Sequence, residues 1–328
     1  MLFLILVVIS VLGYVSSAAL KDIRPLVIWH GLGDTYDSPG MLQFQSEVKK
    51  MHPGIFVHSV YIDQNPKADQ RAGFYGKVND QLDLVAAQFA SVPELSRGFD
   101  AIGFSQGGQF LRAYVERNNT PPIFNLITFG SQHMGISDLP LCSAYDLLCQ
   151  IARRAARGGV YSDWAQENLI QAQYFRDPAQ LTLYLSASSF LADVNNEVLL
   201  PPRNETYAAN LATLSNLVLV LFAQDKTVVP KESAWFGSEA PPQDDDAMPF
   251  GLGSQVPLTG SELLQSKQEK TIVPMRLQPL YAEDWIGLRT LDERGAVTLA
   301  TCPGEHMQLT GCWEDLVGKW IGWTFDQV

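Results

Sequence analysis

The chain has 328 residues, of which 46% are hydrophobic and 18% are charged, so it can bury one large α/β core or two smaller ones. Its formal net charge of −12 at pH 7 argues against a nucleic-acid partner, because nucleic acid binds to a basic surface. The same charge argues against a polybasic membrane anchor.

The N-terminus is apolar and uncharged. Met1–Ala19 has an apolar core at Leu2–Val15 and ends in the small residues Ser16-Ser17-Ala18-Ala19. This pattern is typical of a secretory signal peptide at 1–19, followed by a single domain at 20–328. An uncleaved N-terminal anchor is the alternative, because the usual positive residues at the start are missing. The apolar core is short for a membrane span, and we expect no stable span in the mature chain.

Apolar runs and helical patterns alternate along the rest of the chain. Strands are predicted at Pro25–Trp29, Ile55–Ile62, Phe99–Phe104, Asn125–Gly130, Leu217–Ala223 and Ala296–Thr301. Helices are predicted at Lys77–Ser91 and Gln109–Asn118, and Trp313, Leu316, Val317 and Trp320 mark a closing helix. The alternation predicts the α/β class, with a mostly parallel central sheet and helices on both of its faces.

Two intervals depart from this alternation. The first, at about 137–212, contains helical stretches at Ala144–Ala156 and Ser162–Tyr174 and is predicted to be a helical insertion at the carboxyl edge of the sheet. The second, at about 237–270, contains Pro241-Pro242 and Asp244-Asp245-Asp246 and is predicted to be a flexible surface excursion. Three adjacent carboxylates in such a loop are usually solvated rather than bound to a metal.

The sequence Gly103-Phe104-Ser105-Gln106-Gly107-Gly108 lies between a predicted strand and a predicted helix. In this context a G-x-S-x-G motif predicts a nucleophilic serine, because the sharp turn lifts the hydroxyl above the edge of the sheet. The flanking glycines avoid collisions with the neighbouring strand and helix. The alternative is a glycine-rich turn with a solvated serine.

A serine hydroxyl needs a base to take its proton and a carboxylate to orient that base. In the α/β-hydrolase fold, which the motif predicts, the acid and then the histidine follow the serine, each in a loop after a strand. Asp225 directly follows the predicted strand Leu217–Ala223, and His306 follows the last predicted strand. Asp193 is the alternative acid and His133 the alternative base, since the other three of the five histidines precede the serine.

Attack by a serine places negative charge on the carbonyl oxygen, and this charge requires N–H donors already in place. One donor is predicted to be the backbone N–H of Gln106, the residue after the serine. The other is predicted in the loop His30-Gly31-Leu32-Gly33-Asp34, which follows the first strand. Leu32 is the candidate, and its side chain is free to vary because only the backbone acts.

The four cysteines become relevant if the chain enters the secretory route. Cys142 and Cys149 are close in sequence, as are Cys302 and Cys312, so two short-loop disulfides are the simplest of three possible pairings. Buried free thiols are the alternative. No spacing typical of a metal site is present, and we predict no metal.

Two tripeptides have the pattern of N-glycosylation sites. They are Asn118-Asn119-Thr120 and Asn204-Glu205-Thr206, so Asn118 and Asn204 are the candidate acceptors. Asn204 lies among prolines and polar residues, which predicts a surface loop.

Several segments together resemble the palmitoyl-protein thioesterase family. They are Pro25–Asp34, Gly103–Ala113, Asn125–Gly135, Gln171–Pro178, Phe190–Asp193, Asn204–Tyr207, Trp235–Gly237 and Gly304–Leu309. The resemblance spans most of the mature chain, and Gly103–Ala113 is its most specific stretch. Carried over residue by residue, the catalytic triad of the family falls on Ser105, Asp225 and His306.

The chain departs from the family pattern at a few positions. Leu32 replaces the methionine that usually occupies this place in the oxyanion loop, which is harmless if only its N–H works. The resemblance implies a Cys142–Cys149 disulfide, whereas Cys302 and Cys312 have no counterpart in it. The excursion at 237–270 is longer than usual.

The resemblance implies an enzyme that hydrolyses S-palmitoyl or other long-chain acyl thioesters on cysteines, through an acyl-enzyme intermediate and without a cofactor. Its partners would be S-acylated proteins or peptides and the fatty-acyl chain, with the helical insertion over the active site. The expected location is the secretory pathway, ending in the lysosome or vacuole or outside the cell. The alternatives are a secreted lipase or carboxylesterase, an inactive lipid-binding protein on the same scaffold, and a structural glycoprotein.

Overall fold

The computed structural model describes residues 22–138, 159–197, 202–242 and 270–327. Four predicted features lie outside the described residues: the signal peptide, the Cys142–Cys149 pair, the helix at Ala144–Ala156 and the Asp244-Asp245-Asp246 cluster.

A six-stranded sheet with the order β2-β1-β3-β4-β5-β8 forms the centre of the molecule. Its strands are β1 (Leu26–Trp29), β2 (Val57–Ser59), β3 (Phe99–Phe104), β4 (Ile123–Phe129), β5 (Asn216–Phe222) and β8 (Val297–Cys302). Every neighbouring pair is parallel, which confirms the predicted sheet. The carboxyl ends of all six strands therefore lie along the same edge, where a site can be assembled from several loops.

The second strand is shorter than the predicted Ile55–Ile62. β2 lies at the edge of the sheet and pairs only with β1. Phe56 and Val60 each add one more backbone hydrogen bond to β1, but the chain leaves the sheet beyond them. An apolar run alone does not reveal where an edge strand stops pairing.

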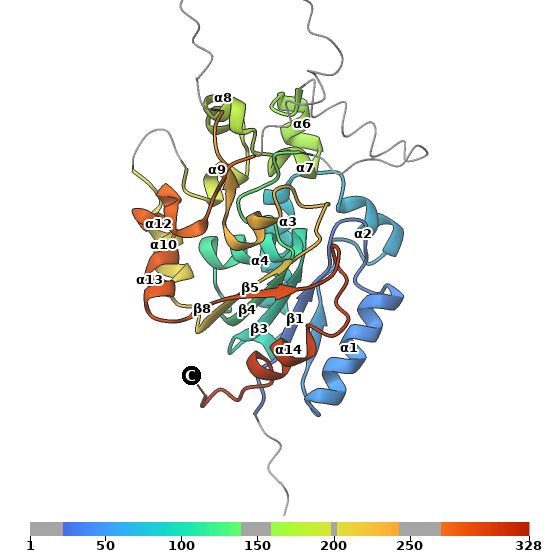
Figure 1. Ribbon diagram of the computed structural model, residues 1–328. Coiled ribbons are helices and arrows are strands. Elements are labelled where there is room, and N and C mark those ends of the chain that lie inside the picture. Colours follow the sequence, from blue (N-terminus) through green and yellow to red (C-terminus); the bar gives the residue numbers. More distant parts are fainter. Residues whose placement is uncertain (1–21, 139–158, 198–201, 243–269, 328) are drawn as a thin grey trace, which may run out of the picture.

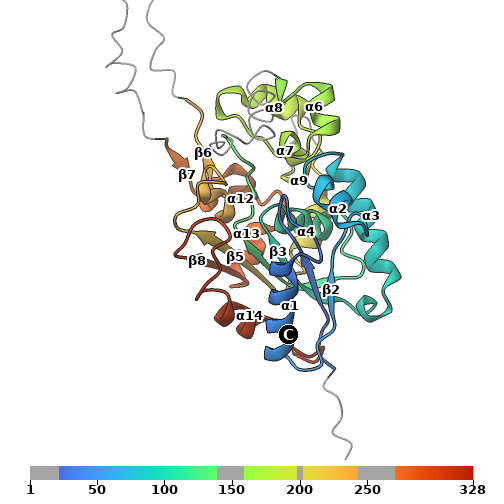
Figure 2. The ribbon, with the colours of Figure 1, turned by 90° about the vertical axis from the view of Figure 1, so that its right-hand side faces the viewer.

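Helices cover both faces of the sheet (Figure 1, Figure 2). They are α1 (Pro39–Met51), α2 (Pro66–Ala72), α3 (Val78–Ser91), α4 (Gln106–Arg117), α6 (Asp163–Asn168), α7 (Ile170–Gln173), α8 (Leu181–Ala187), α9 (Leu191–Val194), α10 (Glu205–Leu211), α12 (Pro279–Ala282), α13 (Leu288–Glu293) and α14 (Glu314–Trp320). Because successive strand side chains point to opposite faces, Leu26 and Ile28 pack with α1 and α14, and Val27 and Trp29 pack with α3 and α4. The sheet thus separates two apolar cores.

Helices α1 and α2 were not predicted, although both begin with ordinary start signals. Ser38 and Asn65 cap them, since each side chain accepts a hydrogen bond from a backbone N–H of the first turn. Each helix also has a proline in its first turn. α2 matters below because it carries Asp69.

The described part of the interval 137–212 contains α6, α7, α8, α9 and α10. Figure 1 shows α6, α7 and α8 at the top of the molecule, beyond the carboxyl ends of the strands. The helical stretch predicted at Ser162–Tyr174 is interrupted at Leu169, which is extended, with φ −115° and ψ 113°. Leu169 forms an antiparallel bridge to Tyr75, so a tertiary contact divides the stretch into α6 and α7.

A short antiparallel strand pair joins the two ends of the predicted excursion at 237–270. β6 (Ser238–Glu239) pairs antiparallel with β7 (Ile272–Val273), and Lys270 contacts Glu239 at 2.8 Å. None of the described helices has the length and apolar character needed to cross a bilayer.

Candidate active site

Ser105 lies at the turn between β3 and α4, with φ 50° and ψ −119°. Its N–H donates to the Phe129 carbonyl of β4 at 2.7 Å, which holds the turn against the neighbouring strand. A Cβ on Gly103 would lie 2.2 Å from Gly108 Cα, and a Cβ on Gly107 would lie 2.4 Å from a carbonyl oxygen of β1. The motif therefore needs these glycines because α4 begins in direct backbone contact with β3 and β1.

Three predicted residues meet above the carboxyl ends of β3, β5 and β8. His306 Nε2 lies 3.1 Å from Ser105 Oγ, and His306 Nδ1 lies 2.6 Å from Asp225 Oδ2. Asp225 Oδ1 accepts hydrogen bonds from the backbone N–H groups of Thr227 and Val228, at 2.8 and 3.0 Å. A carboxylate fixed in this way keeps a proton on Nδ1 and leaves Nε2 free to accept one from the hydroxyl.

Gly130 makes room for the His306 ring. It has a φ of +59°, and a Cβ at this position would lie 2.9 Å from the Phe222 ring and 3.0 Å from His306 Cε1. The Phe222 and His306 rings meet edge to face with centroids 5.8 Å apart. Gly130 was not predicted as a site residue, although a glycine at the end of an apolar strand is a visible signal.

The two alternative residues are occupied elsewhere. His133 is completely buried, with Nε2 3.0 Å from Thr128 Oγ1 and its ring stacked on Phe236 at 4.7 Å. Burial lowers the pKa of His133 well below its usual range. Asp193 accepts a hydrogen bond from Arg117 Nη2 at 2.6 Å.

The loop after β1 lies directly against the serine. A Cβ on Gly31 would be 3.3 Å from Ser105 Cβ, so the chain at Gly31 touches the turn. Within the described part of the chain, the backbone N–H groups of Leu32 and Gln106 donate to no other residue. Leu32 directly follows Gly31 and Gln106 directly follows Ser105, and their N–H groups stay the predicted oxyanion donors.

A buried polar network that the sequence analysis missed connects α4 to the insertion. Arg112 and Glu116 are completely buried, with Nη1 3.0 Å from Oε1. Arg112 Nη2 also donates to Asn195 Oδ1 at 2.8 Å and to the His133 carbonyl at 3.2 Å. Opposite charges four residues apart in the predicted helix, at Arg112 and Glu116, were the available signal.

The remaining predicted residues are placed as follows. Cys302 and Cys312 are joined by a disulfide with a Cα–Cα distance of 5.4 Å, and the loop that it closes contains His306. Asn118 and Asn204 are both exposed, and their glycosylation stays a prediction.

A family model described as palmitoyl protein thioesterase matches residues 25–306. The chain belongs to the palmitoyl protein thioesterase family. The matched range begins just before β1 and ends at His306, so it contains Ser105, Asp225 and His306.

Relatives named as thioesterases come from several organisms. Palmitoyl-protein thioesterase 1 of Caenorhabditis elegans is 38% identical over 286 residues, 87% of each chain. Palmitoyl-protein thioesterase 3 of Dictyostelium discoideum is 32% identical over 307 residues, 92% of this chain and 90% of that one. Lysosomal thioesterase PPT2 of Homo sapiens is 27% identical over 285 residues, 85% of this chain and 80% of that one.

Among solved structures, a monoacylglycerol lipase from Paleococcus ferrophilus aligns over 92% of this chain and 94% of that chain, with a TM-score of 0.40 and 11% identity. The α/β-hydrolase fold is assigned from the sheet itself, with its parallel strands and the strand–turn–helix geometry at Ser105. This assignment confirms the predicted fold and identifies a hydrolase scaffold.

Proposed function

We propose that the protein hydrolyses thioesters between long-chain fatty acids, such as palmitate, and cysteine residues of proteins or peptides. The observation that carries the proposal is the continuous contact from Ser105 through His306 to Asp225, at 3.1 and 2.6 Å. Membership of the palmitoyl protein thioesterase family supports the choice of substrate class.

In the first step, Ser105 Oγ attacks the acyl carbon while His306 Nε2 takes the hydroxyl proton. Asp225 stabilises the imidazolium that forms and does not itself become protonated. The carbonyl oxygen becomes negative and accepts hydrogen bonds from the N–H groups of Leu32 and Gln106. Each such donor contributes about 2.7–4 kcal/mol to lowering the barrier in comparable enzymes.

Collapse of this intermediate breaks the carbon–sulfur bond and leaves an acyl ester on Ser105. The cysteine sulfur departs with the proton from His306, or as a thiolate, because a thiol with a pKa of about 8.5 is a good leaving group. Water then attacks the acyl ester, with His306 again acting as base, and releases the free fatty acid and the serine.

A palmitoyl chain must be sheltered from water, since each methylene carries about 0.8 kcal/mol of hydrophobic free energy. Most large apolar residues of the insertion, such as Ile170 and Phe190, already belong to the buried core. Leu32 and Tyr75 are instead 37% and 39% exposed. The Leu32 side chain lies close to Gly73, since a Cβ on Gly73 would be 3.6 Å from Leu32 Cδ1. We therefore propose that the acyl chain leaves Ser105 along the exposed apolar side chains of Leu32 and Tyr75.

The lysosome is the proposed location. Relatives named lysosomal thioesterases support it, together with the predicted signal peptide.

The decisive experiment compares a palmitoyl-cysteine peptide with the matched palmitoyl oxygen ester, using the purified mature protein and its Ser105→Ala variant. We expect preference for the thioester and loss of at least a thousandfold in kcat in the variant, with the fold intact by circular dichroism. Preference for the oxygen ester would support a lipase instead. If a folded protein turned over neither substrate, the lipid-binding alternative would replace the proposal.

A further inference from the structure

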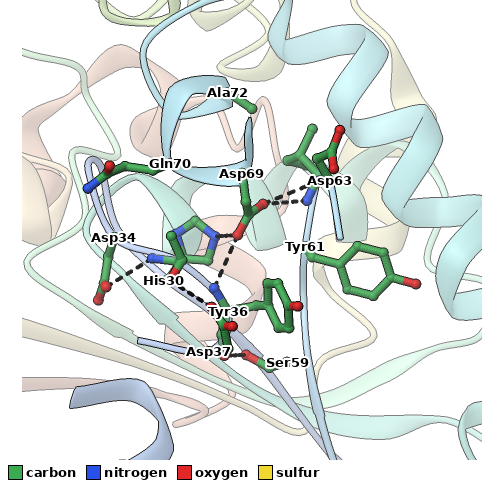
Figure 3. Close-up of polar contacts among 12 residues, drawn as sticks. His30, Asp34, Tyr36, Asp37, Ser59, Tyr61, Asp63, Asp69, Gln70 and Ala72 are labelled. Atoms are coloured by element: carbon green, nitrogen blue, oxygen red, sulfur yellow. Dashed lines mark hydrogen bonds and ion pairs between the residues drawn. The ribbon is translucent and has the colours of Figure 1, made fainter. Parts of the chain in front are cut away.

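A buried histidine–aspartate pair joins the loop that carries the Leu32 N–H to helix α2 (Figure 3). His30, the first residue of this loop, is 3% exposed, and Asp69 of α2 is completely buried. His30 Nε2 lies 3.1 Å from Asp69 Oδ2, in an ion pair whose direction falls short of an aligned hydrogen bond. Neither residue takes part in the proton transfers described above.

Both ring nitrogens of His30 face an acceptor. Nδ1 lies 3.0 Å from the Gly31 carbonyl oxygen, and Nε2 faces the Asp69 carboxylate. A neutral imidazole has only one N–H. One of its nitrogens would therefore face an acceptor oxygen with a lone pair instead of a proton, which is repulsive. The imidazolium donates from Nδ1 to the Gly31 carbonyl and places its positive charge beside the Asp69 carboxylate, so the geometry favours a charged His30.

Asp69 is itself held in place by the backbone. Its Oδ1 accepts from the Ile62 N–H at 2.7 Å, and its Oδ2 accepts from the Tyr36 N–H at 3.1 Å (Figure 3). Burial alone would raise the pKa of Asp69, but His30 and these N–H groups outweigh burial and lower it. Asp69 therefore provides a fixed negative charge beside the His30 ring.

The contact between His30 and Gly31 reaches the oxyanion donor through a single peptide group. The Gly31 carbonyl and the Leu32 N–H belong to the same planar peptide unit, and in a trans peptide they point in opposite directions. Fixing the carbonyl toward the His30 ring therefore fixes the N–H on the far side. A charged donor on the carbonyl also polarises the peptide and strengthens its N–H as a donor.

We propose that His30 and Asp69 form a positioning pair that orients the Gly31–Leu32 peptide, so that the Leu32 N–H is aligned with the oxyanion before substrate arrives. This inference rests on the proposed function insofar as the Leu32 N–H binds the oxyanion. It assigns a role to two residues outside the contacts that join Ser105, His306 and Asp225.

The pair also has a defined pH range. Burial tends to lower the pKa of His30, but Asp69, the Gly31 carbonyl and the charge of Asp34 outweigh burial and raise it. The stabilisation from His30 is complete below its ordinary pKa of about 6.5 and is lost as pH rises through the raised value. The contribution of Asp69 is lost only as pH falls through its lowered pKa. Orientation by the pair is therefore retained under mildly acidic conditions and lost under alkaline ones.

The test replaces Asp69 by Asn, with Asp63→Asn as the matched control. Asp63 is an exposed carboxylate a few residues away, which accepts from the Asn65 N–H at 2.7 Å. We expect Asp69→Asn to lower kcat by about 10- to 100-fold, less than the 10²–10³ for complete loss of a donor, with KM changed less than twofold. The alkaline limb of its pH–rate profile should move to lower pH. The control should match wild type in both respects.

Two further measurements keep the inference separate from the choice of substrate. The reaction of a fluorophosphonate with Ser105 depends on the same N–H donors. Its rate should therefore fall in Asp69→Asn even if the protein does not hydrolyse thioesters. In wild type, ¹⁵N NMR, assigned with a His30→Gln variant, should show both His30 nitrogens protonated at pH 6. Unchanged fluorophosphonate reactivity in a folded Asp69→Asn variant, or a neutral His30 at pH 6, would overturn the proposal.

Discussion

Ser105 adopts a backbone conformation that an L-residue rarely occupies, and its surroundings impose that conformation. Such a conformation costs about 1–3 kcal/mol and persists only where neighbouring contacts enforce it. Here the Ser105 N–H is bound to β4, and the glycines at 103 and 107 allow α4 to approach β3 and β1 closely. The strain therefore presents the hydroxyl to His306 without any movement of the sheet.

The two downstream histidines allow a paired test at the level of single residues. We expect His306→Ala to lower kcat/KM by several orders of magnitude with little change in melting temperature, since its ring is at the sheet edge. His133→Ala should instead lower the melting temperature, because it removes a buried ring stacked on Phe236, while kcat changes only a few-fold. Steady-state kinetics and thermal melts of both variants check this, and the reverse pattern would identify His133 as the base.

Sequence reasoning at this scale succeeded where chemistry is tied to chain order. The motif around Ser105, and the strands that precede Asp225 and His306, placed three residues that the structure brings within contact distance; their roles remain proposals. Sequence reasoning could not find Asp69, because only the folded chain brings α2 into contact with His30. A buried pair formed between separate elements leaves no local pattern.

At the scale of elements, the segment between β8 and α14 contains His306 and is closed by a disulfide. His306 lies inside the loop between Cys302 and Cys312, so the disulfide restricts the segment that must hold the imidazole. Cys302, the last residue of β8, is buried in the apolar core on the α14 side of the sheet, and this burial anchors one end of the loop. The loop therefore depends on both the bridge and the core.

Removing the bridge with Cys302→Ser and Cys312→Ser together should lower the free energy of unfolding by about 2–3 kcal/mol, given the short loop that it closes. We also expect kcat to fall, because the His306 loop gains freedom. Urea unfolding at equal protein concentration measures the first effect. A variant with unchanged stability and unchanged kcat would show that the bridge does not hold the loop.

The predicted elements agree with the structure wherever an apolar run is buried on both sides, as in β3 and β5. They fail where a distant contact determines the local shape. Leu169 breaks a helical pattern because it bridges Tyr75, and β2 ends early because it has one neighbour only. The short antiparallel pair β6 and β7 joins segments far apart in sequence, so no window of residues predicts it.

At the scale of the whole molecule, an arginine and an aspartic acid are buried together at the end of the sheet opposite the site. Arg24 and Asp100 are almost completely buried, with Nη1 3.7 Å from Oδ1. Burial raises the pKa of Asp100 to about 7, even though Arg24 and the Asn125 N–H oppose it. The folded protein therefore binds more protons than the unfolded chain between about pH 3.9 and pH 7.

It follows that this carboxyl favours folding most strongly in acid, and that its contribution declines as pH rises toward 7. We expect the stability of wild type relative to Asp100→Asn to fall between pH 5 and pH 7, by at most about 1.4 kcal/mol per pH unit. Urea unfolding of both proteins at each pH measures the difference. A difference that is constant, or grows with pH, would contradict the expected protonation.

The contact of Arg112 with Asn195 has a consequence for how proteins of this shape diversify. Arg112 of α4, the helix that starts after Ser105, donates a buried hydrogen bond to Asn195 in the segment that follows α9. A lineage that exchanged this segment for another would remove the Asn195 acceptor and leave one buried hydrogen bond of Arg112 unmade, at a cost of about 1–3 kcal/mol. New specificities are therefore expected to arise by substitutions along the outer side of the insertion, while its inner side is inherited together with the nucleophile.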